Sequence, residues 1–173
     1  NMAGLDNRDQ AKTFIYALLY GAGDAKIGAV VNGSAKDGAQ LRSRFMANMP
    51  AYKRLSEAVI RKGGSEGKLK ALDGRVLRVR SGHASLNTLI QGSSAVLMKK
   101  WFMYVDHHLR RRKLQSKIVA MIHDELVLES CKKDVDASKE CVILSISQVN
   151  KAYGLRCRLD CDVQVGDNWS EIH

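Results

Sequence analysis

Four side chains near the start of the chain are spaced by four and could together bind a nucleoside triphosphate. Two cations, Arg8 and Lys12, precede two aromatic residues, Tyr16 and Tyr20. In an α-helix each residue turns by about 100°, so steps of four drift by about 40° and the four side chains form one slanting stripe. Cations can hold phosphates while a ring packs against sugar and base. A solvated basic face with its tyrosines in the core is the alternative.

A second set of polar side chains, His83, Asn87 and Gln91, repeats the spacing of four. Imidazole and amide groups can donate hydrogen bonds, and every base pair offers acceptors in the minor groove. Donors on one helix face could therefore follow a duplex without reading its sequence. Three ordinary polar surface residues are the alternative.

The third candidate, His123-Asp124-Glu125, separates two apolar runs. Adjacent carboxylates at a tight turn point in different directions, so one could bind a hard divalent cation while the other supports it. A two-metal reaction would need a second carboxylate from elsewhere. A solvent-exposed turn is the alternative.

Hydrophobic periodicity and chain breakers predict the helices that would position these residues. Asp6 or Asn7 could cap the first helix, while Pro50 and Gly63-Gly64 would end the second and third. A long helix should carry an apolar stripe, and a last helix should follow the apolar runs. The expected helices cover residues 8–20, 34–49, 51–62, 85–113 and 135–149.

The expected strands are short. Asp73-Gly74 is a hairpin signal within residues 68–80, and residues 117–122 and 126–128 should form a second hairpin with residues 123–125 at its bend. Alternation predicts a final strand at 156–165. The sequence therefore predicts an α+β fold, in which a helical subdomain to about residue 65 precedes a mixed layer of antiparallel strands and helices.

Composition bounds the partners. The 173 residues carry 28 Lys and Arg against 18 Asp and Glu, so the net charge is 28 − 18 = +10, which favours polyanions. No apolar run reaches the roughly 18 residues of a membrane span, and NMAGLDNRDQ lacks the features of a signal peptide, so we expect a cytoplasmic protein. Four cysteines without a CxxC pair favour free thiols over a disulfide framework or a zinc site.

The segment RDQAKTFIYALLYGAGDAKIG resembles the fingers-helix motif of the family A DNA polymerases, and it is most similar to the replicative polymerases of T7-like phages. The resemblance continues through LDGRVLRVRSGHASLNTLIQGSSA and IHDELVLE, the latter matching the family's second catalytic carboxylate motif, and reaches VGDNWSEIH. The motifs keep the family's order over nearly all of the chain. The resemblance implies a fingers subdomain at 1–65 and the carboxyl-terminal part of an antiparallel-sheet palm at 66–173.

The resemblance also implies roles for the first stripe. Arg8 and Lys12 would bind the phosphates of the incoming deoxynucleoside triphosphate, and Lys12 is also a candidate proton donor to the pyrophosphate leaving group. Tyr16 would lie against the sugar and the nascent base pair, and Tyr20 by the templating base.

For the second set, Asn87 and Gln91 match the family's minor-groove contacts to primer-template DNA. His83 stands where many cellular members have arginine, and it is expected to bind DNA together with Asn87 and Gln91.

The family's second carboxylate motif places Asp124 as a ligand of two catalytic Mg²⁺ ions. His123 would lie near the primer terminus, and Glu125 would support the site. The implied reaction is attack by a primer 3′-hydroxyl on the α-phosphate of the nucleotide, in a DNA-directed DNA polymerase.

One family feature is missing. The first catalytic carboxylate lies in a DxSxxExR-like segment upstream of the fingers motif, and GLDNRD does not match it. We therefore expect a naturally split polymerase or a processed or engineered fragment, whose amino-terminal portion or partner chain carries that carboxylate and the thumb. The alternative is a non-catalytic duplex-DNA-binding module derived from a polymerase, which would hold DNA by its basic face.

Overall fold

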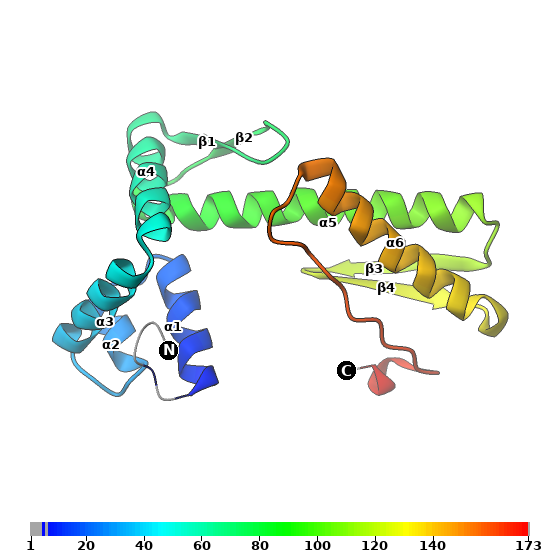
Figure 1. The fold of residues 1–173 in the computed structure, drawn as a ribbon, viewed down its shortest axis with the longest axis horizontal. Coiled ribbons are helices and arrows are strands. Elements are labelled where there is room, and N and C mark those ends of the chain that lie inside the picture. Colours follow the sequence, from blue (N-terminus) through cyan, green and yellow to red (C-terminus); the bar gives the residue numbers. More distant parts are fainter. Residues whose placement is uncertain (1–4, 6, 173) are drawn as a thin grey trace. The chain divides into compact units, whose positions relative to one another are not determined.

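The computed structural model describes residue 5 and residues 7–172 as two compact units, and the division between them, at Ser93 and Ser94, falls within one long helix (Figure 1). Helices predominate, and the strands form two separate antiparallel hairpins, which confirms the predicted α+β class. The helices are α1 (Arg8–Leu19), α2 (Asp24–Ala29), α3 (Ala35–Asn48), α4 (Pro50–Glu66), α5 (Ser85–Arg111) and α6 (Val135–Tyr153). The strands are β1 (Lys68–Lys70), β2 (Val76–Arg78), β3 (Ser116–Ile122) and β4 (Glu125–Ser130).

Helix α1 begins where the sequence predicts. The Asn7 side chain accepts a hydrogen bond from the Gln10 backbone N–H at 2.8 Å, which satisfies a donor that the first helical turn leaves unpaired. Asp6, the other predicted cap, lies outside the described residues. The opposite face of α1 is buried, and its Phe14 ring packs edge-on against Phe45 of α3.

The short helix α2 is absent from our sequence prediction. Its six residues are too few to show a clear hydrophobic period, and tertiary contacts hold it. The Arg42 guanidinium of α3 donates to the Asp24 carboxylate at 2.7 Å and to the Ala22 carbonyl oxygen at 2.6 Å. A side chain at Gly38 of α3 would clash with the Asp24 carbonyl, so α2 and α3 approach through glycine.

The predicted end of the third helix is wrong. Helix α4 continues through Gly63-Gly64 to Glu66 and ends at Gly67, whose φ of 63° is left-handed. Gly63 instead serves packing, because a Cβ there would clash with the side chain of Ser85 at the start of α5. Glycine content alone does not distinguish a helix end from a close helix contact.

The predicted first hairpin is confirmed. Strands β1 and β2 pair antiparallel, with Leu69 opposite Leu77. Both leucines pack into a small core with Val59 of α4 and Leu86 of α5. At Gly92 of α5 a Cβ would lie only 2.6 Å from Leu77, so the hairpin rests directly on the helix there.

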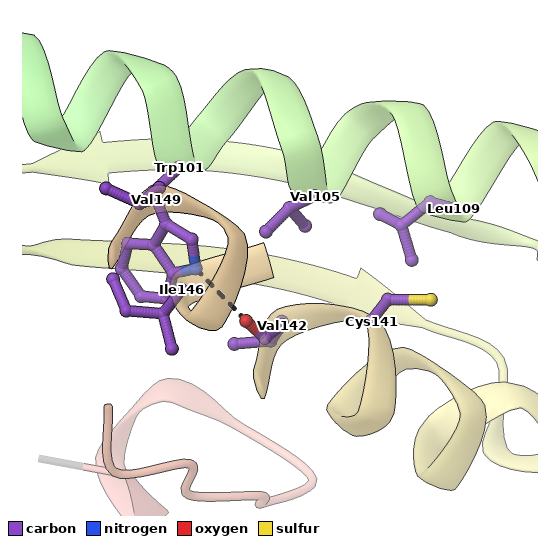
Figure 2. Packing of buried hydrophobic residues seen from close by; sticks show 7 residues of the cluster. All are labelled: Trp101, Val105, Leu109, Cys141, Val142, Ile146 and Val149. Carbon is purple, nitrogen blue, oxygen red and sulfur yellow. Dashed lines mark hydrogen bonds between the residues drawn. The ribbon is translucent and has the colours of Figure 1, made fainter. Parts of the chain in front are cut away.

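The core of the second unit lies between α5 and α6 (Figure 2). The Trp101 indole N–H donates to the Val142 carbonyl oxygen at 3.1 Å, which satisfies the one polar group of a buried ring. Strands β3 and β4 pack their inner side chains, such as Ile118 and Leu128, on this core. Its buried residues are Trp101, Val105, Leu109, Cys141, Val142, Ile146 and Val149.

The predicted final strand at 156–165 does not form. A strand needs a neighbouring strand to pair with, and here side chains take the backbone groups instead. The Asn150 side chain donates to the Leu159 carbonyl oxygen and accepts from the Leu159 N–H, both at 2.8 Å. The segment is therefore extended but irregular.

Two further expectations concern the whole chain. The four cysteines are all free thiols, as predicted. Within residues 7–172, no helix combines the length and the apolar character needed to cross a bilayer.

Candidate active site

The stripe on α1 faces solvent. Arg8 and Lys12 are exposed, and the Tyr16 and Tyr20 side chains are 50% and 57% exposed. The two rings stack, with centroids 6.4 Å apart and planes inclined by 28°. The tyrosines are therefore not core residues, and the helix presents two cations and an aromatic surface on one side.

The end of α1 meets the start of α5 within the first unit. The Gln91 side-chain amide lies 3.5 Å from the Tyr20 hydroxyl, at the outer limit of a hydrogen bond. Gly21 follows the helix with a φ of 71°, and a Cβ there would lie 2.8 Å from the His83 carbonyl oxygen. Glycine is required at this position by both its backbone conformation and this close approach. Two of the predicted sets of site residues are thus neighbours.

The expected single stripe of His83, Asn87 and Gln91 is wrong in one respect. His83 lies in a 3-10 turn at Gly82–Ala84, directly before α5, so only Asn87 and Gln91 share a helix face. The turn lies against α4, where a Cβ at Gly82 would make ordinary van der Waals contact with the Cα of Gly64 at 3.7 Å. His83 and Gln91 are exposed, and Asn87 is half-buried.

A cavity of about 420 Å³ adjoins this junction, and no sequence motif marks it. Its walls include Gly21, His83, Arg42 and Tyr52. The Tyr52 hydroxyl is buried and has no hydrogen-bond partner among the residues that the structure describes, and burial raises the pKa of Tyr52. No local pattern marks Tyr52, because its surroundings come from α1, α3 and α4 together.

Asp124 lies at the turn of the second hairpin, in the second unit. Strands β3 and β4 pair up to Ile122 and Glu125, so His123 and Asp124 alone form the turn. His123 has a φ of 51°, which is unfavourable for a residue with a side chain and is held by the pairing on both sides. His123 and Asp124 are exposed, and Glu125 is half-buried.

A pocket of about 650 Å³ opens beside this turn. Asp124 and Glu125 line it together with Asp160 and Asp162 of the carboxyl-terminal segment. Cys161 lies between Asp160 and Asp162 in the chain. Burial is the largest cause that raises the pKa of its thiol, and the two neighbouring carboxylates raise it further, so the thiol stays protonated. The rest of the lining is mostly apolar, and Lys139 adds a cation to the four carboxylates.

The donor set at this turn suits a partly hydrated hard cation. In the described part of the chain, no three His, Cys, Asp or Glu side chains converge as a complete metal site. Mg²⁺ commonly retains several waters and takes one or two protein carboxylates together with substrate phosphates. The exposed carboxylate of Asp124 fits the role of one such ligand.

The exposed cations and tyrosines of α1, and the exposed aspartate at the turn of an antiparallel hairpin, belong to the motifs on which the sequence resemblance rests. Residues 2–171 match the DNA polymerase family A, and the chain belongs to this family. The resemblance derived from the motifs is thereby confirmed.

Two phage relatives are similar over 99% of this chain. The DNA-directed DNA polymerase of Escherichia phage Phieco32 is 37% identical and that of Escherichia phage T7 is 34% identical, with 29% and 27% of the relative covered. DNA polymerase I of Geobacillus stearothermophilus is 28% identical over 94% of this chain and 20% of its own length. The chain thus spans less than a third of the length of these relatives.

The fold agrees with this assignment. The POL domain of Pol1 from M. smegmatis, solved in complex with DNA primer-template and dNTP, has a TM-score of 0.76. The two share 20% sequence identity, and the match covers 82% of this chain and 27% of that one. The likeness at this identity establishes a polymerase fold.

Proposed function

We propose that this chain is the fingers and carboxyl-terminal palm portion of a DNA-directed DNA polymerase, with residues 1–65 as fingers and 66–173 as palm. The observation that carries the proposal is the α1 stripe, whose motif residues all face solvent while Gln91 lies against Tyr20. A solvent-facing stripe leaves the cations free to meet a triphosphate. The substrates are primer-template DNA and deoxynucleoside triphosphates.

The stripe would order the incoming nucleotide along the helix. Arg8 and Lys12 bind its phosphates, where charge-assisted hydrogen bonds are strongest, and Lys12 gives a proton to the departing pyrophosphate. Tyr16 lies against the sugar and the new base pair, and Tyr20 by the templating base. The two rings stack, so each limits the rotamers of the other.

The junction with α5 would hold the primer-template. Asn87 and Gln91 donate to minor-groove acceptors that all base pairs share, and His83 lies beside them at the end of α1. The contact between Gln91 and Tyr20 supports a connection between the templating base and the minor groove.

Asp124 would hold the catalytic Mg²⁺ ions from this chain, with a second carboxylate supplied by the amino-terminal portion of the polymerase. When bound, the two ions activate the primer 3′-hydroxyl and stabilise the leaving oxygen. The strand pairing would hold the turn that carries Asp124. The half-buried Glu125 would support the site, and His123 would lie near the primer terminus.

Primer extension tests this proposal. We expect no extension by the purified chain alone, because it brings only one of the two carboxylates. Mixing it with a polypeptide that corresponds to the remaining length of its relatives should restore Mg²⁺-dependent synthesis. Extension by the chain alone would contradict partner dependence. DNA binding without extension in the mixture would favour the alternative, a non-catalytic DNA-binding module. The net charge of +10 supports DNA binding in either case.

Tyr16→Phe should change sugar discrimination while leaving normal incorporation intact. A dideoxynucleotide has no 3′-hydroxyl and loses the interactions that this group makes. The phenolic hydroxyl of Tyr16, near the sugar, can replace those interactions. Removing it should raise discrimination against dideoxynucleotides about tenfold, the equivalent of one hydrogen bond. The measurement is the ratio of kcat/KM values for the two nucleotide types in the reconstituted enzyme. Tyr20→Phe is the matched control and should leave the ratio unchanged. Equal ratios in wild type and Tyr16→Phe would refute the role of the Tyr16 hydroxyl in sugar discrimination.

A further inference from the structure

The outer face of the β1–β2 hairpin carries three cations in close register. Lys68 is paired directly with Arg78, and Lys70 follows two residues along the same strand. Side chains that are directly opposed, or two apart along a strand, lie on the same face of a sheet. Leu69 and Leu77 occupy the other face and pack inward, so Lys68, Lys70 and Arg78 together form one exposed surface, the basic hairpin face.

This arrangement costs the free chain stability. Like charges directly opposed across two strands repel each other, and a two-stranded hairpin has little stability to spare. Within residues 7–172, none of the three side chains forms an ion pair, although cations nearby do, such as Arg75 with Asp73 at 2.7 Å. An anion between Lys68 and Arg78 would relieve the repulsion.

The spacing suits a chain of phosphates. Lys68 and Lys70 are separated by about 7 Å along β1, and Lys68 and Arg78 by about 5 Å across the pair. One phosphate can therefore meet Lys68 and Arg78 together while the next along an extended strand meets Lys70. The hairpin has no aromatic side chain, so stacking of bases is not its chemistry.

The location indicates which polyanion reaches this face. The hairpin rests on α5 at Gly92, the residue after Gln91, which we assign to the minor groove. The hairpin that carries the basic face thus packs on the same stretch of α5 that carries Asn87 and Gln91. A nucleic-acid strand that leaves that site is the nearest source of consecutive phosphates.

We propose that the basic hairpin face binds the phosphate backbone of the single-stranded template that extends beyond the primer-template duplex. This inference rests on the proposed function and adds to it a second DNA contact, independent of base sequence. The contact would hold the unpaired template against the hairpin while the duplex occupies the Asn87 and Gln91 face.

Binding of labelled DNA to the 173-residue chain tests the proposal. The test variant combines Lys68→Gln, Lys70→Gln and Arg78→Gln. The matched control combines Lys53→Gln, Arg54→Gln and Arg61→Gln, which removes the same charge from exposed positions of α4 in the same unit. Each protein is titrated by fluorescence anisotropy with a primer-template that has a 5′ overhang of about ten nucleotides, and with the same duplex made blunt.

Wild type and control should prefer the overhang, and the test variant should lose that preference. Three lost phosphate contacts should weaken overhang binding about 100-fold near 0.1 M salt and lower the slope of log K against log salt by about 2. Circular dichroism should show an unchanged fold, and Lys68→Gln alone should raise the Tm because it removes the repulsion from Arg78.

The other outcomes are also decisive. Equal weakening of test and control variants, or equal loss on blunt DNA, would show diffuse charge and overturn the proposal. Binding of polyglutamate at this face, with no binding of single-stranded DNA, would show an acidic protein partner and also overturn it. Overhang binding that depends on the three cations, without primer extension in the reconstituted mixture, would sustain this site and remove the proposed polymerase function.

Discussion

Asp124→Asn in the reconstituted polymerase is expected to lower the rate of nucleotide incorporation by at least about 10³-fold. The substitution keeps the shape of the side chain but removes the charge that the proposed Mg²⁺ ions need. Asp124 is exposed at the hairpin turn, so its loss leaves no buried group unpaired and the fold should not change. Binding of duplex DNA should be nearly unaffected.

Single-turnover extension at saturating nucleotide is the measurement, with duplex affinity determined separately. Glu129→Gln is the matched control, because Glu129 is an exposed carboxylate on the same hairpin, paired with Lys117 and away from the turn. It should incorporate nucleotides at the wild-type rate. A rate for Asp124→Asn within tenfold of wild type would refute the assignment of Asp124 as a metal ligand.

Lys12→Gln is expected to reduce the rate of incorporation by about 10²–10⁴-fold, the range typical of a lost general acid. Lys12 is exposed on α1, one turn from both Arg8 and Tyr16. The substitution removes a phosphate-binding charge and a proton donor together, so nucleotide affinity should fall as well.

Lys12→Arg separates these two roles. Arginine keeps the charge but does not give up its proton, so nucleotide affinity should recover while the rate stays low. Pre-steady-state kinetics resolves the nucleotide Kd from the maximal rate, and Lys26→Gln, an exposed lysine on α2, should change neither. If Lys12→Arg restores the full rate, Lys12 acts through charge alone.

Local sequence determined most elements of this protein. The helix over α1 follows from its helix formers, the Asn7 cap and Gly21, all of which act within a few residues. The turn at Asp73-Gly74 and the apolar runs around Asp124 likewise specify their hairpins by neighbours in the chain. The order and spacing of the motifs also sufficed to indicate the polymerase family, because spacing along the chain is itself sequence information.

Other features depended on residues distant in the sequence. Helix α2 is held by Arg42 from α3, and α4 passes through Gly63 because Ser85 needs the space there. In the segment predicted as a strand at 156–165, backbone groups hydrogen-bond to the side chains of Asn150 and Asp160 and not to a partner strand. In each case, a long-range contact overrode the local preference.

The candidate site shows the same division. Spacing placed Arg8, Lys12, Tyr16 and Tyr20 on one stripe, but it left open whether the tyrosines faced the core or solvent. Only the packing of Phe14 and Leu18 on the opposite face decided that the tyrosines are exposed. Likewise, the cations of β1 and β2 are visible in the sequence, but only the strand register shows that Lys68 lies opposite Arg78. Helix periodicity is a property of neighbours, but burial and register are properties of the partner that an element meets in the folded chain.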